Sequence, residues 1–142
     1  MAQQHELPLD EYHRATHEMT NGNPEVYKQL YSRRDDVTLA NPFGPPVRGW
    51  SEVSLTLDRA AEHYRDGEVV EFKNLSTVIT PDMAYTVEIE RLRARVGGAE
   101  EMAVVAVRVT TIFRPEDGGW KVIHRHADPI TTPRPPESVI RG

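Results

Sequence analysis

The histidines near the end of the chain form its strongest chemical constellation. His124, His126 and Asp128 alternate along a segment with the pattern of a β-strand, and alternate residues of a strand share one face. Two imidazoles beside a carboxylate can form an acid–base pair with an orienting partner, or a two-histidine, one-carboxylate metal site. A structural role for the histidines, or a turn of Asp128 away at Pro129, is the alternative. We predict that His124 and Asp128 are catalytic, that His126 binds ligand, and that no metal is bound.

Arg91 is a second candidate, because it lies in a long alternating segment, 83–96. One face of this segment carries Tyr85, Val87, Ile89 and Arg91, and the other carries Thr86, Glu88, Glu90 and Leu92. The more apolar face is expected to point inward, which would bring Arg91 to a cavity. Its guanidinium could there bind a carboxylate through two parallel hydrogen bonds. The alternative is a solvated hairpin in which the arginines pair with neighbouring glutamates.

The remaining predicted ligand-binding residues are polar, apolar or aromatic side chains expected near the same cavity. They are Asn41, Trp50, Tyr85, Val87, Ile89, Val109 and Thr111. Asn41 precedes the proline-rich loop 42–46, which could form the rim of a cavity, although an Asx turn into Pro42 would explain it equally. An ordinary core position is the alternative for the aromatic residues, which make up only 7% of the chain.

Length and composition restrict the classes of function. The 142 residues suffice for one domain, and the absence of cysteine excludes a disulfide scaffold or a cysteine nucleophile. A net charge of −5 argues against a dedicated nucleic-acid binder. No apolar run could cross a membrane and no signal peptide is apparent, so we expect a cytoplasmic protein with neither nucleic-acid nor membrane partners. No phosphate loop, dinucleotide fingerprint or zinc-protease motif occurs, and no cofactor is predicted.

The order of the predicted elements indicates an α+β fold. Helices are expected over 10–19, 24–31 and 51–66, and strands over 37–40, 69–79, 83–96, 102–114 and 120–127. Helices followed by long antiparallel strands predict a curved sheet that wraps around the helices and leaves a cavity. We expect a single domain over 1–128 and a proline-rich tail over 129–142.

Several local phrases resemble the SnoaL-like branch of the nuclear transport factor 2-like superfamily. They are the segments 36–44, 46–50, 108–114 and 117–126, within a resemblance that covers about residues 8 to 128. The resemblance implies a cone-shaped fold, with about three N-terminal helices packed in a curved antiparallel sheet. It also implies a pocket for a small molecule and a homodimer formed through the outer face of the sheet. Because this fold hosts many activities, it indicates structure more than function.

Ketosteroid isomerase is a relative whose catalytic residues can be compared with this chain. Its general base aligns with Asn41, its oxyanion-binding aspartate with Thr111, and its oxyanion-binding tyrosine with Ala15. An amide cannot shuttle a proton, so that isomerase activity is not expected. An arginine in the pocket of the related kinase association domain corresponds to Arg91.

These observations predict a small-molecule-binding protein. It could be a proton-transfer enzyme of the isomerase, cyclase or dehydratase type that acts on a small organic acid or carbonyl compound. The alternative is a non-catalytic module for ligand binding or dimerisation.

Overall fold

Helices dominate the first half of the fold and strands the second half. The computed structural model describes residues 6–141. Its elements are α1 (Leu9–Met19), α2 (Glu25–Leu30), β1 (Thr38–Ala40), β2 (Val47–Arg48), α3 (Trp50–Ala61), β3 (Tyr64–Ile79), β4 (Ala84–Val96), β5 (Ala103–Glu116), β6 (Gly119–Asp128) and η1 (Pro136–Val139). The third helix is therefore shorter than predicted, because Tyr64 already pairs with Val96 in the sheet.

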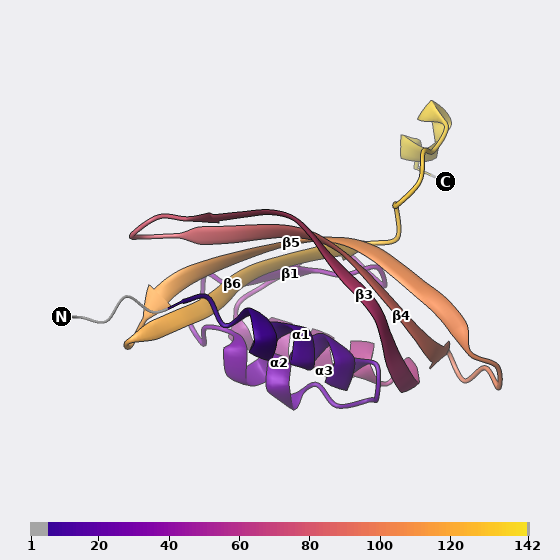
Figure 1. The fold of residues 1–142 in the computed structure, drawn as a ribbon, viewed down its shortest axis with the longest axis horizontal. Helices are drawn as coiled ribbons and strands as arrows, with labels where there is room; N and C mark the ends of the chain where they lie inside the picture. Colours follow the sequence, from indigo (N-terminus) through magenta and orange to yellow (C-terminus); the bar gives the residue numbers. More distant parts are fainter. Residues whose placement is uncertain (1–5, 142) are drawn as a thin grey trace.

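The six strands form one curved sheet in the order β2-β1-β6-β5-β4-β3. Strands β3 to β6 pair antiparallel with their neighbours, as predicted, whereas β1 lies parallel to β6. The three helices lie against the concave face of the sheet, which gives the predicted cone (Figure 1). The α+β prediction is thus confirmed, with a mixed sheet in place of a purely antiparallel one.

Helix α1 is the element that fills the concave face. Its buried residues Tyr12, Ala15, Thr16 and Met19 recur at helical spacing and so form one stripe. Tyr12 packs edge-on against Phe113 of β5, with ring centroids 5.9 Å apart, and neither side chain is appreciably exposed. The helix therefore places a tyrosine hydroxyl and a threonine hydroxyl inside the cone.

The predicted orientation of β4 is wrong. Its inner face carries Ala84, Thr86, Glu88, Glu90, Leu92 and Ala94, and the face with Tyr85, Val87, Ile89 and Arg91 points outward. The two glutamates can be buried because Glu90 pairs with the guanidinium of Arg125 and Glu88 accepts a hydrogen bond from His13. Arg91 instead pairs on the outer face with Glu71, at 3.0 Å.

A β-bulge decides the orientation of β6. The register shifts between the pairs Phe113–Val122 and Ile112–His124, so Ile123 has no partner on β5. Trp120 and Val122 point inward before the bulge, and the odd-numbered residues point inward after it. The extra residue exchanges the two faces of the strand. Arg125 and Ala127 are therefore inside the cone, whereas His124, His126 and Asp128 lie on the outer face, contrary to prediction.

The segment after Asp128 leaves the sheet on the side opposite the helices (Figure 1). Asp128 Oδ1 accepts the backbone N–H of Ile130 at 3.0 Å, which sets the direction of departure. The residues 129–141 are exposed or half-buried, and their only helical turn is η1.

Candidate functional site

The interior of the cone contains an ion pair between Arg125 and Glu90. Two parallel hydrogen bonds join them, from Nη1 to Oε2 at 3.1 Å and from Nη2 to Oε1 at 3.0 Å. Both side chains are buried, and this bidentate geometry offsets much of the cost of removing the charges from water. Burial alone would lower the pKa of Arg125, but the charge and hydrogen bonds of Glu90, together with Tyr12 and Tyr27, outweigh burial and raise the pKa well above its usual range. The guanidinium is therefore a permanent cation.

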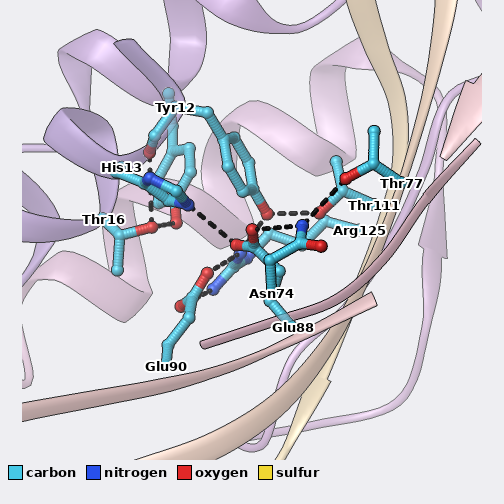
Figure 2. Close-up of polar contacts among 10 residues, drawn as sticks. Tyr12, His13, Thr16, Asn74, Thr77, Glu88, Glu90, Thr111 and Arg125 are labelled. Atoms are coloured by element: carbon cyan, nitrogen blue, oxygen red, sulfur yellow. Dashed lines mark hydrogen bonds and ion pairs between the residues drawn. The ribbon is translucent and has the colours of Figure 1, made fainter. Parts of the chain in front are cut away.

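Tyr12 extends this ion pair into a hydrogen-bonded network (Figure 2). Its hydroxyl accepts a hydrogen bond from Arg125 Nη1 and is also hydrogen-bonded to the hydroxyl of Thr111. A second hydroxyl pair, Thr16 and Tyr27, lies beside it. Burial raises the pKa of Tyr12 to about 12, although the charge of Arg125 opposes the rise. Tyr12 therefore remains a neutral hydrogen-bonding group at physiological pH.

A second polar cluster joins α1 to the sheet through Glu88. His13 Nε2 donates to Glu88 Oε1 at 2.8 Å, and Asn74 Nδ2 donates to Glu88 Oε2 at 2.9 Å (Figure 2). The imidazole also stacks on the ring of Phe72, with centroids 4.2 Å apart and planes within 7° of parallel. Burial lowers the pKa of His13, but the hydrogen bond and charge of Glu88 outweigh this, so the pKa is raised. Burial raises the pKa of Glu88, but the hydrogen bonds from His13 and Asn74 outweigh this effect, so the pKa is lowered.

Two adjoining hollows lie between the helices and the inner face of the sheet. Their volumes are about 50 and 60 Å³. Both are lined by Met19, Tyr27, Pro42, Tyr64, Arg125 and Ala127. The first also reaches Glu90 and Leu92, and the second reaches Asn41 and Phe43. The ion pair therefore lies at the wall of a small interior space with aromatic sides.

A wider groove lies on the other side of Phe43. Its volume is about 320 Å³, and its lining includes Asn41, Phe43, Pro45, Arg59 and His63. The groove lies between the loop 41–46 and helix α3. Asn41 Oδ1 accepts the backbone N–H of Phe43 at 3.0 Å, so the Asx turn is present and Asn41 also lines both spaces.

A family model decides which group of proteins this arrangement belongs to. The model describes a SnoaL-like domain and matches residues 8–131. The chain belongs to the SnoaL-like domain family. Among curated proteins, none matches this SnoaL-like chain.

Solved structures share the fold at low sequence identity. A nuclear transport factor 2-like superfamily protein from Salmonella enterica is 14% identical, with a TM-score of 0.72 over 94% of this chain and 92% of the other. A ketosteroid isomerase-like protein from Erwinia carotovora is 16% identical, with a TM-score of 0.66 over 87% of this chain and 92% of the other. An NTF2-like protein from Cytophaga hutchinsonii is 19% identical, with a TM-score of 0.60 over 86% and 94%. These similarities establish that the SnoaL-like chain has the NTF2-like fold.

The structure of this SnoaL-like domain divides the predicted site residues into three groups. Val109 and Thr111 lie on the inner face of β5, and Asn41 lies at the rim. Trp50 is the first residue of α3 and lines none of the three spaces. The guanidinium carbon of Arg33 lies over its ring, 4.2 Å from the ring centroid. The outward group consists of Tyr85, Val87, Ile89, Arg91, His124, His126 and Asp128. The predicted residues are therefore not brought together in one place.

The outer histidines have partners of their own. His124 Nδ1 lies 2.7 Å from the hydroxyl of Thr38, and His126 Nε2 lies 3.0 Å from Asp128 Oδ2. Asp128 also accepts from Arg108 Nε at 2.8 Å. Burial and the neighbouring His126 lower the pKa of His124. In residues 6–141, no three His, Asp or Glu side chains are gathered as a potential metal site.

The interior polar residues were not predicted as functional. They are Tyr12, His13, Glu88, Glu90 and Arg125. The sequence of β4 did contain a pattern that indicates its inner face. Leu92 and Ala94 share the face of the two glutamates, whereas the charged Arg93 and Arg95 share the face of Arg91. None of the helices in the described part of this SnoaL-like chain is long and apolar enough to cross a membrane.

Proposed function

We propose that this SnoaL-like domain binds a small molecule inside the cone through an oxygen atom held by Arg125. The supporting observation is the hydrogen-bonding state of the guanidinium. Within residues 6–141, three of its five N–H groups donate to Glu90 and Tyr12, which leaves Nε–H and one Nη2–H for another acceptor. Because Glu90 already balances the charge, these donors suit a carbonyl oxygen as well as a carboxylate. The aromatic walls Tyr27 and Tyr64 would pack against the apolar part of the molecule.

Proton transfer on a bound carbonyl compound is the reaction that this arrangement would support. The N–H groups of Arg125, held in place by Glu90 and Tyr12, would stabilise the negative charge that develops on the carbonyl oxygen. Glu90 is the carboxylate in the lining of the first hollow and is the candidate proton acceptor. The proposal therefore retains an isomerase-, cyclase- or dehydratase-type activity and moves the acid–base role from His124 to the interior.

A titration with small probes tests the binding site. We expect acetone and acetate to shift the side-chain Nε–H signal of Arg125 saturably in ¹⁵N-edited spectra. Arg125→Lys keeps the charge but removes the planar donors, so probe affinity should fall at least about tenfold. Because this variant lacks the Nε–H group, the affinities of all variants are compared through the backbone amide signals of Leu92 and Ala127, which line the same hollow. The matched control is Arg114→Lys, because Arg114 pairs with Asp36 and Glu116 and lines none of the hollows. If neither probe shifts the wild-type signal, or if both variants behave alike, the proposed binding site is wrong.

A second candidate function is association of two copies through the outer face of the sheet. Exposed apolar side chains on this face support it, namely Val78, Tyr85 and Val104, of which Val104 is 67% exposed. Ile112 lies at the centre of the face, between Tyr85 and His124.

Sedimentation equilibrium tests this association. We expect a dimer for the unmodified protein and a monomer for Ile112→Glu, because a charge on each copy would be buried in the contact. Val139→Glu is the matched control, since Val139 is an exposed apolar residue of the tail. A monomeric unmodified protein would exclude the second candidate.

A further inference from the structure

The proposed interior site is too small for most ligands by itself. Ligand pockets usually have volumes of roughly 300–1,000 Å³. The hollow beside Asn41 has only about 60 Å³, whereas the groove outside it has about 320 Å³. The two spaces share Asn41, Phe43 and Ala60 in their linings. Phe43 is therefore part of a thin wall that separates a small inner space from a larger outer one.

We propose that Phe43 is a gate, and that the hollow and the groove together bind one elongated ligand whose outer end is anionic. This inference rests on the proposed function, because Arg125 would hold the inner end of the same molecule. The gate would open when the side chain of Phe43 rotates away, which joins the two spaces into one pocket of ordinary ligand size.

The surroundings of Phe43 permit such a rotation. Its side chain is 46% exposed, and its ring contacts those of His63 and Tyr64 at centroid distances of 4.6 and 5.9 Å. A Cβ atom added at the neighbouring Gly44 would meet nothing within 4 Å, so this part of the loop is not packed against the domain. Prolines on both sides of Phe43 and Gly44 restrict the backbone. We therefore assign the opening to the side chain and not to the loop.

The chemistry of the groove indicates the outer part of the ligand. Pro45 and Val47 provide apolar surface beside Phe43, and Arg59 with His63 provides polar groups farther out. Within residues 6–141, Arg59 makes no ion pair closer than 4.0 Å, although the adjacent Asp58 pairs with Lys28 at 2.6 Å. An exposed guanidinium without an acidic partner suits a carboxylate. The expected ligand thus has a carbonyl group, an apolar middle and a carboxylate at its far end.

Three ketones separate the parts of this proposal. Acetone tests the inner space alone, 2-heptanone adds an apolar chain, and 6-oxoheptanoate adds a terminal carboxylate. We expect 6-oxoheptanoate to bind at least tenfold more tightly than acetone in the Arg125 titration. Arg59→Gln should remove most of that gain, about fivefold or more, while it leaves the affinity for 2-heptanone unchanged.

Exchange rates test the gate itself. Phe43→Ala should increase the association rate of 6-oxoheptanoate about tenfold, measured by NMR line-shape analysis, because the passage is then always open. Leu55→Ala is the matched control, since Leu55 is a similarly exposed apolar residue of α3 (45%) and lines neither space. Thermal unfolding of each variant shows that the fold is retained.

The outcomes distinguish the two proposals. If acetone binds at Arg125 but Arg59→Gln and Phe43→Ala leave the binding of 6-oxoheptanoate unchanged, the gate and outer subsite are wrong and the interior site stands. If none of the three ketones shifts the Arg125 signal, the interior site is wrong, and the inference that rests on it falls too.

Discussion

Replacement of Arg125 by methionine is expected to lower the free energy of unfolding by about 3–5 kcal/mol. Methionine has a suitable volume but no charge, so Glu90 would be left buried without its two hydrogen bonds from the guanidinium. The hydroxyl of Tyr12 would lose a donor in the same step. Urea unfolding followed by circular dichroism measures the change.

The double variant Arg125→Met, Glu90→Leu removes both charges. It therefore distinguishes the effect on stability of losing the whole ion pair from the effect of leaving Glu90 buried without a partner. A buried ion pair replaced as a whole by apolar residues is often neutral or stabilising. We therefore expect the double variant to recover most of the stability that Arg125→Met loses. A single variant as stable as the wild type would show that Glu90 reaches water or another partner, and would contradict the buried network.

Replacement of His13 by glutamine is expected to lower the free energy of unfolding by about 1.5–3 kcal/mol in weakly acidic solution and by much less in alkaline solution. The raised pKa of His13 contributes stability fully below its unfolded value near 6.5, and this contribution is lost as the pH rises through the folded value. The lowered pKa of Glu88 contributes stability above its unfolded value near 4.5, and this is lost as the pH falls through the folded value. The difference between wild type and variant should therefore be largest between about pH 5 and pH 6.5.

A double-mutant cycle with Glu88→Gln checks the origin of this pH dependence. The charges that face His13 are Glu88 and Glu90 on β4 and Asp10 on its own helix, with Arg125 of β6 acting on Glu88. Without the Glu88 carboxylate, His13→Gln should change stability by nearly the same amount at pH 5.5 and pH 9. An undiminished pH dependence in the Glu88→Gln background would assign the effect to Glu90 or Asp10 instead.

The wrong predictions about the site concern the faces of two strands. The apolar residues Tyr85, Val87 and Ile89 suggested the inner face of β4, because apolar residues are usually buried. The rule fails here since the cone buries carboxylates that have partners on other elements, His13 on α1 and Arg125 on β6. These partners are 75 and 35 residues away along the chain, beyond the reach of a local pattern.

The error on β6 has a different physical cause. Strict alternation places His124, His126 and Asp128 on the same face as the buried Trp120 and Val122. One unpaired residue, Ile123, reverses the alternation and turns Arg125 inward. A single-residue bulge has no marker in this segment, because Ile123 is an ordinary strand residue.

The amino-acid sequence by itself determined the three helices, the longer strands, their order and the cone-shaped fold, but not the short strand β2 or the parallel pairing of β1 with β6. Helical and strand periodicities and local turn residues carry this information, and they act over a few residues. It also placed Thr111 and Val109 toward the interior and Asn41 at the rim. The tertiary structure alone decided which polar groups meet inside the cone. That choice depends on the sheet register, on a bulge and on pairing between distant elements, because a charge can be buried only where its partner arrives.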